Sequence, residues 1–273
     1  MGRATRIDTA GGWHHVMNRG VARQHTFHSD ADRVEFGRLL GVGHDRFGVE
    51  VHAYCLVPNH YHLLVHCPLG GLSPFMQQLG SVFTRHVNER LGRDGPLFRG
   101  RFRSIAVTDD RQLLATTRYI HRNALDIVGV TDVAGYRWSS HRTYLGLRAA
   151  PPWLRTETVL AYFAGDPDQF ARFVSGDGAD ERGSRLLTGA NLHGAIELVV
   201  GEFDAELTRS SQGVARTVAA LLSDDAGPSG LRQAACELLG GSPTPAALAR
   251  ARRAARAEPV LLTVADRVRQ LCA

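Results

Sequence analysis

Two β-rich runs separated only by Pro58-Asn59 constrain the fold of this chain more than any other feature. Residues 47–57 (FGVEVHAYCLV) and 60–66 (HYHLLVH) are both rich in the β-branched and aromatic residues that favour strands. A connection of two residues is too short for a crossover, so it joins antiparallel neighbours. The sequence therefore predicts a β-hairpin and an antiparallel sheet built around it.

The segment before the hairpin predicts one strand and one helix. Residues 13–18 (WHHVMN) are typical of a short strand. After a polar loop, Ser29 or Asp30 can cap a helix, and the glycines at Gly41 and Gly43 are expected to end it.

The segment after the hairpin predicts a helix and another strand. Ser73 is expected to cap a helix with Pro74 at its first position, and Gly92 to end that helix. Residues 101–107 (RFRSIAV) then predict a strand.

The last helix of this region begins at Asp109, with Gln112 in a capping-box-like position, and runs towards Asn123. The predicted order is therefore strand, helix, strand, strand, helix, strand, helix. Such an alternation with one internal hairpin indicates an α+β fold, with a ferredoxin-like antiparallel sheet covered by helices. We expect this domain over residues 1–150, a helical extension over 151–180, and a mainly helical C-terminal region over 185–273.

Charge and histidine are concentrated in the first part of the chain. Residues 1–150 hold 19 arginines against 12 acidic residues, a net charge of +7, whereas the remainder has a net charge of −2. Twelve of the 13 histidines also lie in residues 1–150. A positive field suits a polyanion such as nucleic acid, so we expect both binding and chemistry in this part.

The sequence favours a soluble, cytoplasmic protein. Its apolar runs are shorter than the ~18 residues of a membrane span, and its first residues lack the apolar core of a secretory signal. The four cysteines, Cys55, Cys67, Cys236 and Cys272, show no close-paired spacing. We therefore expect no disulfide framework and no membrane partner.

His60 and His62 are a candidate metal-binding pair. Side chains alternate along a strand, so these two imidazoles project to one face while Tyr61 projects to the other. Two imidazoles leave coordination positions for a third ligand, phosphate oxygens and water, as a catalytic ion requires. Taken alone, such a pair is more often only a polar strand face. A structural zinc site that combines Cys55 or Cys67 with histidine lacks a second close cysteine pair.

Tyr119 and Asn123 are candidates to complete this site. They are four residues apart and share one helical face, displaced from Ile120 and Ala124, so Tyr119 need not belong to the core. If the helix lies over the histidine strand, Asn123 can offer a carbonyl oxygen to the metal while the phenol reaches a bound phosphate. A phenol with a pKa of ~10 needs a nearby cation to act as nucleophile at neutral pH.

Five segments together resemble a known family. They are WHHVMNRG at 13–20, VHAYCLVPNHYHLLVH at 51–66, LFRGRFRS at 97–104, RYIHRN at 118–123 and YRWSSHRTYLG at 136–146. In this order and spacing, the combination resembles the HUH single-tyrosine (Y1) transposases, and among them the REP-associated tyrosine transposases of the IS200-like family.

The resemblance implies a function for each candidate residue. His60 and His62 would bind a divalent metal, Mg²⁺ or Mn²⁺, with Asn123 as third ligand. Tyr119 would attack single-stranded DNA beside a hairpin and become linked to a 5′ phosphate. Residues 124–129 (ALDIVG) depart from the family's usual Asn-Pro-Val-Arg-Ala-Gly continuation, which puts DNA contacts of that loop in doubt.

A band of arginines is the candidate DNA surface. Nine arginines lie between positions 85 and 122, interleaved with Phe98 and Phe102, which we expect to be buried. Guanidinium groups neutralise phosphates. The six predicted DNA contacts are Arg85, Arg99, Arg101, Arg103, Arg118 and Arg122. DNA binding is also the candidate role of residues 185–273.

Two other functions are compatible with the sequence. One is a catalytically inactive or domesticated protein that binds hairpin DNA, and the other is a metal-dependent phosphoesterase that uses water as its nucleophile. The sequence does not decide between a monomer and a homodimer.

Overall fold

The protein forms two compact units in the computed structural model. The structure describes residues 9–176, 210–223 and 229–272, with a few single positions between 192 and 207. One unit comprises residues 1–108 and 116–175, and the other comprises residues 109–115 and 176–273.

The first unit is built on one four-stranded antiparallel sheet. Its strands are β1 (Gly12–Arg19), β2 (Glu50–Val57), β3 (His60–Cys67) and β4 (Arg103–Val107). Their order across the sheet is β2-β3-β1-β4, with β1 antiparallel to both its neighbours. The predicted hairpin at Pro58-Asn59 and the ferredoxin-like α+β order are both confirmed.

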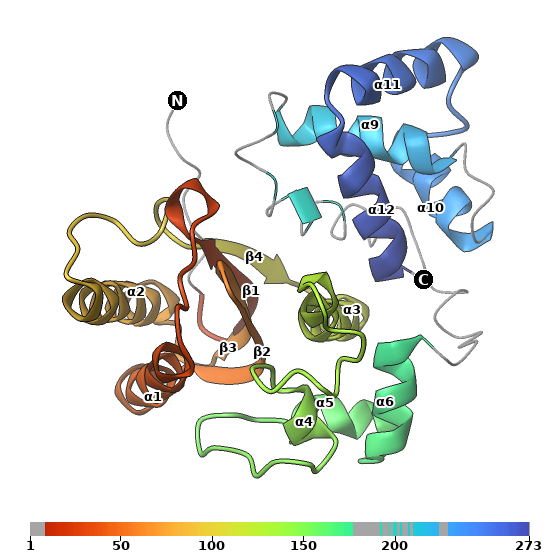
Figure 1. Ribbon diagram of the computed structural model, residues 1–273. Helices are drawn as coiled ribbons and strands as arrows, with labels where there is room; N and C mark the ends of the chain where they lie inside the picture. Colours follow the sequence, from red (N-terminus) through yellow and green to blue (C-terminus); the bar gives the residue numbers. More distant parts are fainter. Residues whose placement is uncertain are drawn as a thin grey trace. The chain divides into compact units, whose positions relative to one another are not determined.

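Helices lie on both faces of this sheet. Helices α1 (Asp30–Phe47) and α2 (Leu72–Leu91) cover one face, and α3 (Asp110–Arg122) lies on the other (Figure 1). The apolar core fills the space under α1 and α2, where aromatic rings such as Phe36 and Phe83 pack against Tyr61 of β3 or against one another. The α3 face is more polar, and it carries most of the histidines described below.

Helix α1 begins where the sequence predicts but ends later. Ser29 accepts a hydrogen bond from the Asp32 backbone in a capping box, which confirms the predicted start. The predicted end at Gly41 and Gly43 is wrong, because the helix continues to Phe47 and stops at Gly48, whose φ of 66° is left-handed.

Both internal glycines of α1 serve close packing instead. A Cβ at Gly43 would lie 2.4 Å from the Phe75 ring of α2, and one at Gly41 would lie 2.8 Å from the Trp153 ring. The missing side chains therefore let two aromatic rings reach the helix backbone.

Helix α2 begins earlier than predicted. Its N-cap is Gly71, so Ser73 and Pro74 lie inside the first turn and Ser73 is not the cap. Proline is tolerated there because the first turn has no intrahelical partner for its N–H groups. The predicted end at Gly92 is confirmed, with φ of 61°.

The last strand and the start of α3 follow the sequence closely. Strand β4 begins at Arg103, two residues after the predicted start, and Phe98 and Phe102 are buried as expected. The Gln112 backbone donates to Asp109 Oδ1 at 2.8 Å, which confirms Asp109 as the cap of α3.

Short helices follow α3 and complete the first unit. They are η2 (Asn123–Asp126), α4 (His141–Tyr144), α5 (Glu157–Leu160), η3 (Ala161–Phe163) and α6 (Pro167–Ser175), in addition to the early 3-10 turn η1 (Val21–Arg23). Between them the chain runs beside β2, where Leu154 bridges to Val51 and Ser139 to Cys55. These bridges cover the outer edge of the sheet, and Leu154 belongs to the predicted extension.

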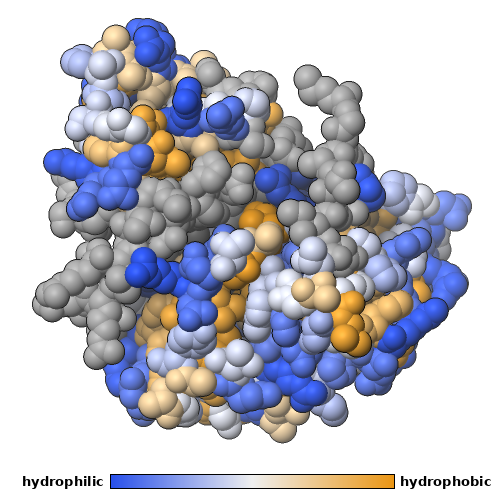
Figure 2. Space-filling view, turned by 180° about the vertical axis from the view of Figure 1, so that it is seen from behind, coloured by the Kyte–Doolittle hydropathy of each residue, from blue (hydrophilic) through white to orange (hydrophobic). Residues whose placement is uncertain are grey.

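The described part of the second unit is helical, as predicted. It contains α9 (Ser211–Ser223), α10 (Ser229–Leu239), α11 (Pro245–Ala257) and α12 (Val260–Cys272). The predicted boundary between residues 180 and 185 lies outside the described residues. On the face shown in Figure 2, hydrophobic side chains form patches set among hydrophilic ones. Among the described helices, none has the length and apolar character needed to cross a membrane.

The fit between α1 and α2 gives a stability test. We expect Gly43→Ala to lower the free energy of unfolding by about 1–3 kcal/mol, because the added methyl group overlaps the Phe75 ring. The matched control is Gly80→Ala in α2, where a Cβ meets no atom within 4 Å and improved helix propensity should add up to about 1 kcal/mol. Chemical denaturation measures both, and equal stabilities would contradict the packing role of Gly43.

Candidate active site

Imidazoles from two adjacent strands meet on the sheet face that α3 covers. His15 of β1 and His62 of β3 stack with ring centroids 5.1 Å apart, and His60 lies against His62 with centroids 4.9 Å apart. The predicted alternation holds, because Tyr61 belongs to the apolar core on the other face. Three histidine rings therefore adjoin one another on one face.

Each ring of the predicted metal pair is anchored through Nδ1. His60 Nδ1 donates to Asn59 Oδ1 at 2.7 Å, and His62 Nδ1 shares a hydrogen bond of 2.9 Å with His15 Nε2. A metal-binding histidine typically uses its second nitrogen in this way, which fixes the ring orientation and the tautomer. In both rings, Nε2 is then the atom that would bind a cation.

His15 is buried and neutral. Burial, together with the positive charge of Arg103, lowers the pKa of His15 to about 3. A neutral His15 has one nitrogen that can accept a proton, and Nε2 can therefore accept the hydrogen bond from His62 Nδ1–H. This arrangement is the one that a cation on His62 Nε2 requires.

Tyr119 lies over these imidazoles. Its ring meets His62 edge-on at 5.6 Å and His15 edge-on at 5.9 Å between centroids. The side chain is 4% exposed, so Tyr119 is one of the buried core residues. The ring is buried because the face of α3 that carries it packs directly on the histidine face of the sheet. The phenol and the imidazole pair nevertheless form one cluster.

Asn123 is bound to the same helix as Tyr119. Its Nδ2 donates to the Tyr119 backbone carbonyl at 2.8 Å, and the side chain is buried. Its Oδ1 has no hydrogen-bond partner in the part of the chain that the structure describes. An amide oxygen in this state suits a hard cation, and the role of Asn123 as third ligand stays a prediction.

Four of the six predicted DNA-binding arginines lie at or near the surface. Arg85, Arg99 and Arg101 are exposed, and Arg103 is half-buried. The Arg99 backbone donates to the Arg19 carbonyl, and Arg19 pairs with His60 across β1 and β3. Arg99 thus lies about 10 Å, or two strand spacings, from His60. Arg85 is on α2, the helix that covers the opposite face of the sheet.

Arg118 and Arg122 take part in packing within the first unit. Arg118 is 9% exposed and its guanidinium lies 5.6 Å from the Phe173 ring centroid. Arg122 donates to the carbonyls of Val174 and Ser175 at the end of α6. These contacts stabilise α6 against α3, and the DNA-binding role of both arginines stays a prediction.

Sequence reasoning missed the residues that orient the metal pair. It assigned His15 no part in the site and gave Asn59 only a turn role. The signal for Asn59 was its position directly before His60, whereas the His15 contact joins residues 47 apart and is invisible in sequence. The alternative zinc site with Cys55 or Cys67 has no counterpart among the described metal-ligand groups. His121 is a hydrogen-bonded core residue, since Nε2 lies 2.7 Å from Ser140 Oγ.

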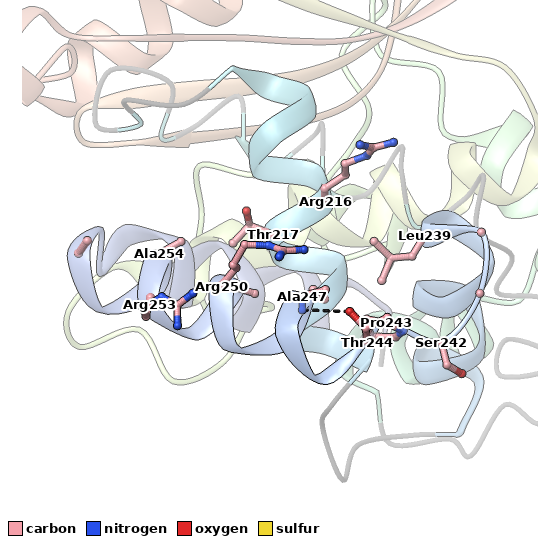
Figure 3. Close-up of a pocket in the computed structure, with 15 residues that line it drawn as sticks. Arg216, Thr217, Leu239, Ser242, Pro243, Thr244, Ala247, Arg250, Arg253 and Ala254 are labelled. Atoms are coloured by element: carbon pink, nitrogen blue, oxygen red, sulfur yellow. Dashed lines mark hydrogen bonds between the residues drawn. The ribbon is translucent and has the colours of Figure 1, made fainter.

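A separate pocket of about 800 Å³ lies within the C-terminal unit. Its lining comes from α9, the connection between α10 and α11, and α11, and includes Arg216, Arg250 and Arg253 (Figure 3). These arginines suit an anionic ligand, and the DNA-binding role of residues 185–273 stays a prediction.

Comparison with known proteins gives a family match for the N-terminal part of the chain. The model of the family described as transposase IS200 like matches residues 10–123. Among solved structures, the chain is similar to the REP-associated tyrosine transposase bound to a REP hairpin, with a TM-score of 0.47 and 16% identity, over 55% of this chain and 89% of that one. No curated protein matches the sequence.

The His15 hydrogen bond predicts a measurable effect on metal affinity. We expect His15→Ala to weaken Mn²⁺ binding at the imidazole pair by about 10- to 100-fold, because His62 loses the acceptor that orients its ring. Isothermal titration calorimetry measures the affinity, and the double variant His60→Ala/His62→Ala identifies which binding belongs to this pair.

His14→Ala is the matched control. His14 is also buried on β1, but it points to the other face and lies 3.2 Å from Ser104 Oγ. It should change stability and leave the affinity of the pair unaltered. An unchanged affinity in His15→Ala would refute the orienting role.

Proposed function

We propose that the chain is a metal-dependent enzyme that nicks and joins single-stranded DNA, with Tyr119 as nucleophile, and the match of residues 10–123 to the IS200-like transposase family model supports this proposal. The observation that carries this proposal is the edge-on contact between the Tyr119 ring and His62, at 5.6 Å between centroids. A phenol beside a pair of metal-type imidazoles is not needed for binding alone.

The donor set can hold a divalent ion, and the resemblance to Y1 transposases implies Mg²⁺ or Mn²⁺. Nε2 of His60 and of His62 would hold it, with Asn123 Oδ1 as the third protein ligand. When bound, the ion polarises the scissile phosphate and lowers the cost of the charge that builds up there. Phosphate oxygens and water would supply its other ligands.

Tyr119 performs the covalent step. Its phenolate oxygen attacks the phosphorus, an O–P bond to the tyrosine forms, and the bond between phosphorus and the 3′ oxygen breaks. The phenolic proton passes to solvent, and the departing 3′ oxygen takes up a proton to become a hydroxyl. The 5′ phosphate stays on Tyr119 until a 3′ hydroxyl attacks it, which reverses the step and joins the strands.

Access to DNA requires Tyr119 to move. At 4% exposure, its hydroxyl cannot meet a phosphate in this conformation. Rotation about χ1 or a shift of α3 away from the sheet would bring the phenol to the surface while His60 and His62 stay on β3. DNA binding would supply the energy for this change.

Single-stranded DNA beside a hairpin is the substrate we propose, as the resemblance to Y1 transposases implies. The exposed Arg99 and Arg101 supply positive charge on a segment that adjoins β1, near the His60 end of the sheet. They suit contacts to phosphates close to the scissile bond.

Two alternatives make different demands on Tyr119. A protein that only binds hairpin DNA needs no phenol, and a phosphoesterase would use water in its place. Either of these two functions would tolerate phenylalanine at position 119. The placement of a tyrosine against two imidazoles therefore favours neither of them.

A covalent adduct tests the proposal directly. With labelled single-stranded hairpin DNA and Mn²⁺, the wild-type protein should form a protein–DNA species that survives denaturation, because the phosphotyrosine bond is covalent. Tyr119→Phe should form none, while gel-shift affinity for the DNA stays within about twofold, because only one hydroxyl is lost. Adduct yield on a denaturing gel is the measurement.

Tyr162→Phe is the control, since this tyrosine is 45% exposed and lies in η3. It should form the adduct as the wild type does. An adduct in Tyr119→Phe would refute the assignment of the nucleophile. Turnover without any adduct in that variant would indicate a water-using phosphoesterase.

The salt dependence of DNA binding tests the arginines. We expect Arg99→Ala to weaken binding and to reduce the slope of log affinity against log salt concentration by about one, the value for one lost phosphate contact. Arg38→Ala should change neither quantity, because Arg38 lies on α1 in an ion pair with Glu35. Identical slopes for the two variants would remove Arg99 from the DNA surface.

A further inference from the structure

Glu50, His52 and His66 form a second cluster of metal-ligand groups on the first unit. His66 Nδ1 lies 2.9 Å from Glu50 Oε2, and His52 Nε2 lies 3.6 Å from the same oxygen. One ligand atom from each residue lies within 4.8 Å of those of the other two. In the part of the chain that the structure describes, this is the only group of three such residues with that spacing.

An irregularity in β2 brings the three side chains together. Glu50 and His66 are direct cross-strand partners in the β2–β3 pair. The register shifts between Val51 and Ala53, so His52 is the extra residue of a β-bulge. Bulges redirect a side chain, and here the His52 ring reaches the same side as His66, with centroids 6.2 Å apart.

His52 is a buried imidazole that the fold leaves unsatisfied. It is 2% exposed, and neither ring nitrogen has a hydrogen-bond partner among the described residues. Its 3.6 Å separation from Glu50 is too long for a hydrogen bond. Burial also lowers its pKa to about 4, so the ring is neutral near pH 7 and keeps a lone pair for a ligand. Buried polar atoms in this state call for an explanation.

We propose that Glu50, His52 and His66 bind a divalent transition-metal ion, for which Zn²⁺ is the best match. Two imidazoles and one carboxylate are a common zinc donor set, and imidazole favours zinc over magnesium. Tetrahedral coordination at about 2.1 Å places ligand atoms about 3.4 Å apart, close to the two spacings here. Glu50 and His66 are half-buried, so water can supply the fourth ligand.

This site is separate from the His60–His62 pair. His62 and His66 are four residues apart on β3, which corresponds to about 13 Å along the strand. His60 follows the hairpin turn, whereas Glu50 and His66 lie at the open end of the hairpin. An ion there would link β2 to β3, and the inference does not depend on DNA cleavage.

Trp13 provides a direct readout of the site. Its ring centroid lies 4.3 Å from that of His52 and 4.6 Å from that of His66. A paramagnetic ion such as Co²⁺ bound between these imidazoles should quench Trp13 fluorescence. We expect saturable quenching at a ratio of about one ion per chain in the double variant His60→Ala/His62→Ala, which removes the other metal-type pair. Trp13→Phe should abolish it.

Glu50→Gln is the informative variant because it keeps the shape of the side chain and removes its charge. It should weaken Co²⁺ and Zn²⁺ binding in the double-variant background by at least about tenfold. Glu35→Gln on α1 is the matched control and should leave the affinity unchanged. Zn²⁺ should displace Co²⁺ and restore the fluorescence.

Thermal unfolding keeps the test independent of fluorescence. Zn²⁺ should raise the Tm of the double variant, and this rise should be lost on adding Glu50→Gln. Absence of saturable quenching in the double variant, or equal Zn²⁺ affinity with and without Glu50→Gln, would overturn the proposal. Neither result would bear on adduct formation by Tyr119, which is measured separately on DNA.

Discussion

The alternation of side chains across a single four-stranded sheet is the constraint from which the rest of the first unit follows. Every second residue of β3 enters the apolar layer beneath α1 and α2, as Tyr61 and Leu63 do, and the residues between them face α3. Because the face under α1 and α2 supplies the hydrophobic stabilisation, the face under α3 does not have to be apolar. It can hold histidine rings, which an apolar core would exclude.

Burial gives the α3 face an unusual electrostatic character. The pKa values of His52 and His141 are lowered to about 4, that of His15 to about 3, and that of His121 well below its ordinary value, in each case chiefly by desolvation. These imidazoles are therefore uncharged at neutral pH, and for His15 the positive charge of Arg103 acts in the same direction. Neutral rings are the form that binds cations, so the same burial that removes their charge prepares them as ligands or as partners of ligands.

Local patterns in the sequence predicted more of this structure than long-range contacts did. The hairpin, the Ser29 and Asp109 caps and the shared face of His60 and His62 all depend on neighbours within a few residues, and all are confirmed. The errors have a common origin in distant partners. The sequence predicts a helix end at Gly43, whereas the glycine is there to make room for the Phe75 ring. That ring lies in another helix, so local sequence does not reveal the contact. The burial of Tyr119 likewise depends on the sheet beneath it, which helical periodicity alone does not reveal.

The Pro58-Asn59 turn carries an implication for the order in which the chain folds. Asn59 bonds the ring of the residue directly after it, and His62 follows two residues later on the same strand, so both imidazoles are positioned by one short hairpin. Hairpins form within about 1–10 μs, whereas contacts between distant segments form later. Tyr119 lies 57 residues beyond His62. We therefore expect a nascent chain to assemble its imidazole pair first and to acquire its phenol last, an order that pulse-labelled hydrogen exchange would resolve.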